Sequence, residues 1–90
     1  MGILIKTSGE KLEVKPANGE SFSLKEVQGY VEGYVEMFRV GGKKYLFNEE
    51  GLLHDLPQNL KATEELEKDC NQAVQMLVGN VLILEDSEEF

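Results

Sequence analysis

The sequence predicts a small α+β domain, with a mostly antiparallel sheet of about five strands and two helices packed on one side of it. Short runs rich in β-branched and aromatic residues recur along the chain, separated by Gly, Pro and Asn, as in strands joined by turns. Two stretches instead have apolar residues at helical spacing behind a capping residue. A length of 90 residues corresponds to one domain. The expected order of elements is β-β-α-β-β-α-β.

The first two strands are predicted before residue 16. Residues 3–5 read Ile-Leu-Ile, a β-branched-rich run. Residues 11–15 alternate between charged and apolar side chains, which is the period of a half-exposed strand. Ser8-Gly9 separates the two runs, so a hairpin is expected there. Pro16 and Asn18-Gly19 then predict a turn.

The first helix is predicted from a capping box. Ser23 and Glu26 have the spacing at which the side chain of each accepts a hydrogen bond from the backbone N–H of the other. Val27 and Val31 follow at helical spacing. Gly33 is expected to end the helix by adopting a positive φ, which a residue without a Cβ accepts at little cost.

A tandem tetrapeptide lies where the helical pattern ends: Gly29-Tyr30-Val31-Glu32 is followed by Gly33-Tyr34-Val35-Glu36. The first copy is predicted to close the helix. The second is predicted to open a strand, with Tyr34 and Glu36 on one face. The repeat is therefore interpreted as a change of chain direction and not as a functional duplication.

A central hairpin is predicted from residues 34–40 and 43–48, joined by the two-residue loop Gly41-Gly42. This loop places Val40 opposite Lys43, Phe38 opposite Tyr45, and Met37 opposite Leu46. One face of the hairpin then carries the aromatic rings Tyr34, Phe38, Tyr45 and Phe47. The other face carries Val35, Met37 and Leu46.

The second half of the chain predicts one more helix and one more strand. Asn59 is a candidate N-cap, and Glu64 and Glu65 lie in the early turns, near the positive end of the helix dipole. Residues 81–84 read Val-Leu-Ile-Leu, the pattern of a short strand covered on both faces. The domain is expected to span residues 1–85, followed by an acidic tail over residues 86–90.

The charge distribution excludes some functions. The net charge is −8, and residues 46–90 hold eleven Asp or Glu against two Lys. Such a surface repels phosphate backbones, so direct binding to nucleic acid is not expected. A single cysteine forms no disulfide within the chain and fits a reducing, cytoplasmic setting. No apolar run is long enough for a membrane span, and the first residues do not read as a signal peptide.

Four segments of the chain together resemble one known family. They are Gly33-Tyr34-Val35-Glu36, Asn48-Glu49-Glu50-Gly51, Leu56-Pro57-Gln58-Asn59 with Ala62-Thr63, and Gly79-Asn80-Val81-Leu82-Ile83. In order and spacing they are similar to the signatures of the domain of unknown function 3846 family. The family pattern has two glycines before the aromatic residue, and Glu32 occupies the first of these positions here. The resemblance implies a setting in phages, plasmids and other mobile elements of bacteria, and it implies no mechanism.

No pattern of residues indicates catalysis, a metal site or a cofactor, so the protein is predicted not to be an enzyme. His54, beside Asp55, has no Ser or Cys nucleophile at a spacing that completes a triad, and it is interpreted as an exposed loop residue. Glu49, Glu50 and Asp55 lack the alternating oxygen ligands of a calcium loop. Cys70 has no partner at metal-ligand spacing and is interpreted as a small core residue in a helix interior.

Two binding functions remain open. The first is a non-enzymatic binding protein of a phage or mobile element whose acidic second half binds or inhibits a basic host protein. Its candidate contact residues are Glu64, Glu65, Glu67, Asp69, Glu85 and Asp86. The alternative is a module that stacks a small ligand, such as a nucleotide, on the aromatic and basic hairpin. Its candidate residues are Tyr34, Phe38, Arg39, Lys43, Lys44, Tyr45 and Phe47.

Each of these interpretations has a structural counterpart. The acidic residues also fit a solvated face that keeps the protein soluble, and the rings also fit the hydrophobic core of a domain without Trp. The chain is expected to be a monomer or a homodimer. Burial of the hairpin rings distinguishes a core from a binding platform.

Overall fold

A computed structural model of the chain describes residues 2–51, 55–72, 74–85 and 87. The elements in these residues are β1 (Gly2–Ile5), β2 (Lys11–Val14), α1 (Leu24–Val31), β3 (Val35–Val40), β4 (Lys43–Asn48), α2 (Leu60–Cys70) and β5 (Val81–Glu85). Their order confirms the predicted β-β-α-β-β-α-β arrangement. None of the helices in the described residues is long and apolar enough to cross a membrane.

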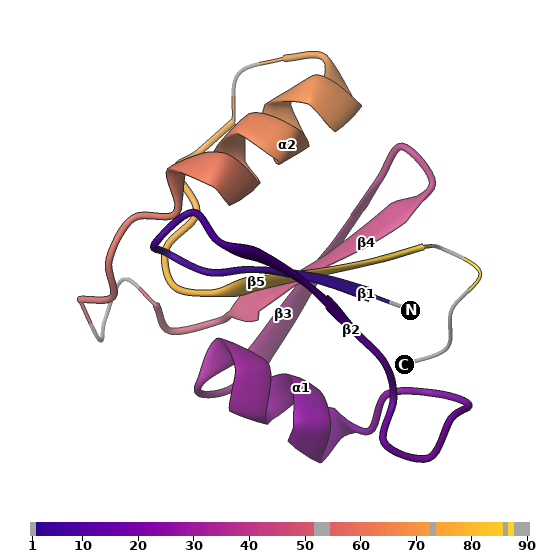
Figure 1. Cartoon of the computed structure of the whole chain (residues 1–90). Helices are drawn as coiled ribbons and strands as arrows, with labels where there is room; N and C mark the ends of the chain where they lie inside the picture. Colours follow the sequence, from indigo (N-terminus) through magenta and orange to yellow (C-terminus); the bar gives the residue numbers. More distant parts are fainter. Residues whose placement is uncertain (1, 52–54, 73, 86, 88–90) are drawn as a thin grey trace.

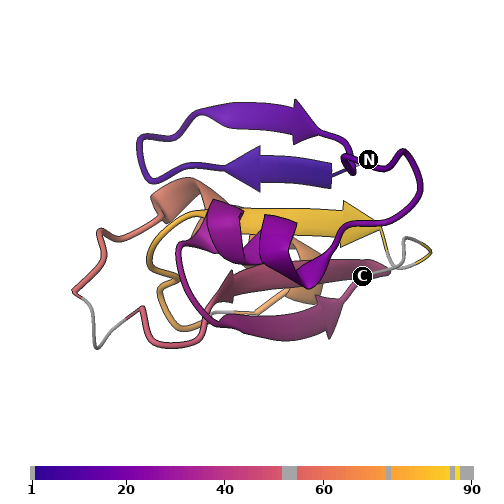
Figure 2. The same cartoon turned by 90° about the horizontal axis from the view of Figure 1, so that it is seen from below.

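The strands form one five-stranded sheet with the order β2-β1-β5-β4-β3, and every neighbouring pair is antiparallel. Figure 2 shows this order across the sheet. β5 comes last in the chain but lies at the centre, between β1 and β4. It therefore joins the N-terminal hairpin to the hairpin of β3 and β4.

The two helices cover opposite faces of the sheet, with α2 above it and α1 below it in Figure 1. The prediction that both helices pack on one side is therefore wrong. The reason lies in β5, in which successive side chains point to opposite faces. Val81 and Ile83 contact the α2 layer, whereas Leu82 and Leu84 contact the α1 layer. A strand that is apolar at every position needs cover on both faces, as the Val-Leu-Ile-Leu run indicates.

Each face has its own hydrophobic core. The core under α1 consists of the buried residues Leu4, Phe22, Val27, Val31, Leu46, Leu82 and Leu84. The core under α2 consists of Ile5, Tyr45, Ala62, Leu66, Leu77, Val81 and Ile83. The central strands contribute to both cores, so the sheet is the middle layer of three.

The predicted start of α1 is confirmed, but the predicted role of Gly33 is wrong. Both hydrogen bonds of the capping box are present, from the Glu26 amide to Ser23 Oγ and from the Ser23 amide to Glu26 Oε1. The residue with the left-handed conformation after the helix is Glu32, with φ +64°. Gly33 is required for a different reason, because a Cβ on it would lie 2.5 Å from Nδ2 of Asn48.

The register of the β3–β4 hairpin is the predicted one: Val40 pairs with Lys43, Phe38 with Tyr45, and Met37 with Leu46. Gly41 and Gly42 both have positive φ, +58° and +77°, as in a type I′ turn. Tyr34 precedes β3 and lies outside the strand.

Asn59 is the N-cap of α2, as predicted, and the last residue of the helix is Cys70. Cys70 is half-buried at that end and does not lie in the helix interior. Asn71 follows in a left-handed conformation, with φ +55°. His54 and, in the expected acidic tail, every residue but Ser87 lie outside the described residues.

Candidate functional site

The rings predicted to form a stacking platform are not brought together. Tyr45 is completely buried under α2, and its hydroxyl donates a hydrogen bond to Oδ2 of Asp69. Phe47 is half-buried beside the same core. Phe38 is 46% exposed, and Tyr34 is 65% exposed and outside the strand. Of the predicted rings, Phe38 and part of Phe47 remain accessible on the α2 face.

The cationic residues of the hairpin do not converge on one point. Lys43 and Lys44 are neighbours in β4, so their side chains lie on opposite faces of the sheet. Nζ of Lys43 lies 3.2 Å from Oδ2 of Asp69, and Lys44 is buried. Arg39 pairs with Lys44 across the hairpin, on the face opposite Lys43. The arrangement therefore differs from a cluster that holds a phosphate.

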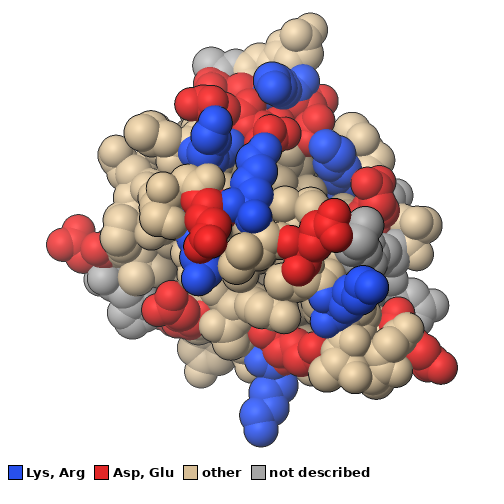
Figure 3. All heavy atoms as spheres, in the orientation of Figure 1, with Lys and Arg blue, Asp and Glu red and all other residues tan. Residues whose placement is uncertain are grey.

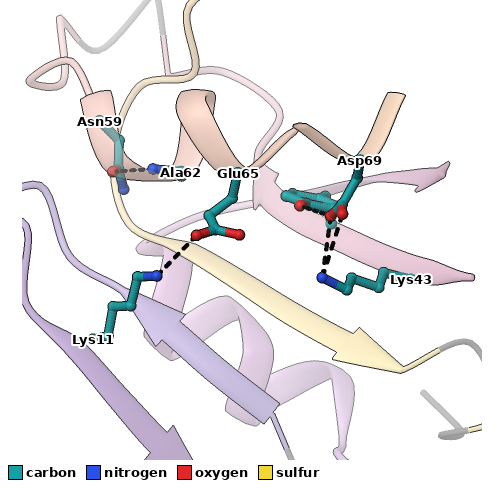
Figure 4. A network of polar contacts seen from close by, with 7 residues as sticks. Lys11, Lys43, Asn59, Ala62, Glu65 and Asp69 are labelled. Atoms are coloured by element: carbon teal, nitrogen blue, oxygen red, sulfur yellow. Dashed lines mark hydrogen bonds and ion pairs between the residues drawn. The ribbon is translucent and has the colours of Figure 1, made fainter. Parts of the chain in front are cut away.

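Two of the predicted partner-binding carboxylates contact the sheet instead of pointing into solvent (Figure 4). Oε1 of Glu65 accepts a hydrogen bond of 2.9 Å from Nζ of Lys11 in β2. This hydrogen bond holds the pKa of Glu65 below its ordinary value. Asp69 accepts from both Lys43 and Tyr45. These carboxylates attach α2 to the sheet.

Tyr45 is the clearest perturbed group in this layer. Burial raises the pKa of its hydroxyl well above the ordinary value, and the adjacent Asp69 raises it further. The hydroxyl is therefore a hydrogen-bond donor at all physiological pH values, and it supports α2 without acting as a base.

The remaining predicted acids do not form a continuous surface with these two. Glu64 is exposed, Glu67 is half-buried, and Glu85 is exposed at the end of β5, opposite Lys43. Asp86 lies outside the described residues. On the face seen in Figure 3, acidic and basic side chains alternate over α2 and the sheet below it.

The Leu-Pro-x-Asn segment has a structural role centred on Asn59, which is completely buried. Its Oδ1 accepts from the Ala62 amide at 3.0 Å and caps α2. Its Nδ2 donates to the backbone oxygens of Ile5 and Gly79, each at 2.9 Å. One side chain therefore connects β1, α2 and the segment before β5. Thr63 extends this connection, because its Oγ1 donates a hydrogen bond to the backbone oxygen of Asn59 and accepts one from the Leu77 amide.

Asn48 has the same kind of role where the end of α1 meets β4. Its Nδ2 donates to the backbone oxygens of Val31 and Glu32 at the end of α1, and its Oδ1 accepts from the Glu50 amide. The close approach of Gly33 leaves room for this amide. Residues of three of the segments that carry the family resemblance thus hold the helices on the sheet.

A hollow in the described surface lies on the α2 face, between the β3–β4 hairpin and residues 74–78. Its volume is about 660 Å³, within the range of sites that bind small molecules or side chains. Apolar side chains provide most of its lining: Phe38, Phe47, Leu66, Val74, Met76 and Leu77. The carboxylate residues Glu36, Glu49 and Glu50 also line it. We call this feature the acid-rimmed hollow.

Sequence patterns indicated only part of the acid-rimmed hollow. Phe38 and Phe47 were predicted as accessible rings, but the opposite wall comes from residues 74–78, which form no regular element. Side chains alternate along a strand, so Glu36 and Phe38 share one face of β3, and this alternation was the sequence signal that placed Glu36 beside the hollow. Across residues 2–51, 55–72, 74–85 and 87, no three His, Cys, Asp or Glu residues are placed to hold a metal ion.

Comparison with known proteins agrees with the four signature segments. No curated protein and no solved structure shows significant similarity to the chain. The family model described as Domain of unknown function (DUF3846) matches residues 1–90, the whole chain. The chain therefore belongs to the DUF3846 family.

Proposed function

We propose that this protein is a small non-enzymatic binding module that holds a basic, partly apolar segment of a partner protein in the acid-rimmed hollow. The observation that carries the proposal is the combination of an apolar floor with carboxylates on its rim. Phe38 is 46% exposed and lines the hollow together with the exposed Glu36. Apolar side chains with a Lys or Arg neighbour complement both parts of this surface.

Electrostatics support a basic partner. The chain has a net charge of −8, and Glu36 and Glu49 are both exposed at the hollow. The field of such a surface speeds association with a positively charged partner and weakens as salt is added. Glu65 and Asp69 already have cationic partners within the chain, so we assign the contact to the exposed Glu36 and Glu49 in place of these two α2 acids.

The family setting supports a partner from the host. Phages and mobile elements, the setting that the resemblance implies, depend on proteins of the bacterium that carries them. A compact acidic module that holds a basic segment of a host enzyme competes with nucleic acid for that segment. We therefore propose inhibition or recruitment of a basic host protein as the biological outcome.

The nucleotide-binding alternative has less support. The smaller hollow near β1 has a volume of about 250 Å³ and is lined by Lys11 and Lys43, but Glu65 and Asp69 hold these lysines. In the larger hollow the carboxylates repel phosphate. A thermal shift on adding ATP, GTP or their monophosphates is the result that favours this alternative.

The test uses a defined probe. The probe is a synthetic peptide with blocked termini that has threonine at every second position and either valine or lysine at the positions between. The peptide carries a fluorescent label, and its binding to the protein is followed by fluorescence anisotropy at about 50 mM and about 300 mM salt. We expect binding at low salt that weakens at high salt, whereas the same peptide with glutamate in place of lysine does not bind. Absence of binding at both salt concentrations refutes the proposed function.

Two matched variants test the position of the site. Glu36→Gln with Glu49→Gln removes two rim charges, and we expect about threefold to tenfold weaker binding. Glu20→Gln with Glu64→Gln removes two exposed charges away from the hollow and changes the net charge equally. An equal loss in both variants shows that only the overall charge matters and contradicts the assignment to the hollow.

A further inference from the structure

β3 forms one edge of the sheet, and within the described residues β4 is the only strand that pairs with it. An edge strand exposes a row of backbone N–H and C=O groups that can pair with another strand. β3 is six residues long and keeps an unbroken register with β4. It contains neither a proline nor a bulge, the usual features that block an edge.

The hairpin geometry shows which backbone groups face outward. In a two-residue type I′ hairpin, Val40 and Lys43 form the hydrogen-bonded pair next to the turn, and such pairs alternate along the strands. The backbone groups of Phe38 and Glu36 therefore point toward β4. Those of Val35 and Met37 point toward the outer edge of β3.

The free edge borders the acid-rimmed hollow. Glu36 and Phe38 belong to β3, line the hollow and are exposed. A strand added beside β3 places every second side chain on the same face as these two residues. An apolar side chain can then contact Phe38 while a Lys or Arg two positions away reaches Glu36.

Charge decides between a foreign peptide and a second copy of the chain. Two copies that pair through β3 about a two-fold axis place their α2 faces on the same side of the joined sheet. The pairing brings two acid-rimmed hollows together and puts chains of net charge −8 side by side. A basic peptide instead neutralises the rim, so charge complementarity favours it.

We propose that the partner segment binds as a sixth strand along β3, with alternate apolar and basic side chains over the acid-rimmed hollow. This inference rests on the proposed function and adds the mode of binding. Backbone hydrogen bonds to Val35 and Met37 supply affinity, and the hollow selects the side chains. The recognised segment is therefore extended, with its basic and apolar residues at every second position.

Backbone methylation of the probe peptide tests the pairing directly. In a strand, successive residues direct their N–H groups to opposite edges. One isomer carries N-methyl groups on its threonines, and the other carries the same number on its valine and lysine residues. If the peptide binds as an added strand, methylation weakens binding of one isomer by about tenfold or more and leaves binding of the other nearly unchanged. The threonine isomer is the weaker one if the added strand is antiparallel, and the other isomer is the weaker one if it is parallel.

The protein side of the interface is tested at Met37. Met37→Pro removes an outward N–H and places a ring at the edge, a substitution that edge strands accept. Met37→Thr is the control that keeps the N–H. We expect about tenfold weaker binding for the proline variant and less than about twofold for the threonine variant. Circular dichroism of both variants checks that the fold is kept.

The outcomes separate this inference from the proposed function. If the unmodified peptide fails to bind at low salt, both are refuted. If it binds but both methylated isomers bind equally, the segment does not add as a strand, and the proposed function alone survives. If light scattering shows a dimer of the free protein that Met37→Pro dissociates, a second copy occupies the edge and the inference is overturned.

Discussion

Asn59 offers the sharpest test of how this fold is held together. Its side chain is completely buried and makes three hydrogen bonds, one to the Ala62 amide and two to the backbone oxygens of Ile5 and Gly79. Asn59→Ala removes the cap of α2, which costs about 1 kcal/mol. It also leaves two buried carbonyl groups without a donor, at about 1–3 kcal/mol each. We expect a total loss of about 3–7 kcal/mol.

This loss is large compared with the whole stability of such a domain, roughly 5–13 kcal/mol for 90 residues. Ser23→Ala is the matched control, because Ser23 caps α1 at an exposed position and supports no other strand. It is expected to cost about 1 kcal/mol. Thermal unfolding followed by circular dichroism then gives a midpoint about 4–8 °C lower for Ser23→Ala and more than about 12 °C lower for Asn59→Ala.

A third variant separates the cap from the two donors. Asn59→Asp keeps an acceptor for the Ala62 amide but turns a carboxylate toward two carbonyl oxygens. At neutral pH it is expected to be at least as unstable as Asn59→Ala. If Asn59→Ala costs no more than Ser23→Ala, or if Asn59→Asp is as stable as the natural protein, the assignment of Asn59 as a buried connector is refuted.

Two further predictions concern the tandem glycines and Tyr45. Gly29→Ala is expected to raise the unfolding free energy by about 0.5–1 kcal/mol, because a Cβ at this helix position meets no atom within 4 Å. Gly33→Ala is expected to lower the unfolding free energy by about 1–3 kcal/mol, because the added Cβ displaces the Asn48 amide. Equal effects of the two substitutions in chemical denaturation contradict this account. The raised pKa of folded Tyr45 stabilises the fold fully below the ordinary value of 10, and this contribution is lost as the pH rises above 10. Tyr45→Phe is expected to lower stability at pH 7 and to flatten the alkaline decline; an unchanged decline refutes the assignment to Tyr45.

Much of the fold was predictable because its signals are local. The capping box of Ser23 and Glu26, the Gly41-Gly42 turn and the cap at Asn59 each depend on residues a few positions apart. The hairpin register followed from the loop alone, since a two-residue turn leaves one pairing.

The errors came from contacts between distant parts of the chain. The residue with positive φ after α1 is Glu32, one position before the predicted glycine, whereas Gly33 makes room for the Asn48 side chain, which is 15 residues away in sequence. Glu32, which stands at the first glycine position of the family pattern, itself adopts the left-handed conformation. Tyr45 and Phe38 pair across the hairpin, yet α2 covers the first and leaves the second half exposed. The alternation pattern of the strands cannot show which ring of such a pair is covered by a helix.

The central position of β5 has a consequence for how the protein is made. During synthesis the β1–β2 and β3–β4 hairpins emerge first, and each can form from neighbouring residues. They cannot join into one sheet until residues 81–85 have left the ribosome, since β5 separates them. Until then both hairpins present open edges and uncovered apolar faces, which favour aggregation. Folding is therefore expected to be completed in one late step, and a nascent chain stalled before residue 81 is the form most in need of a chaperone.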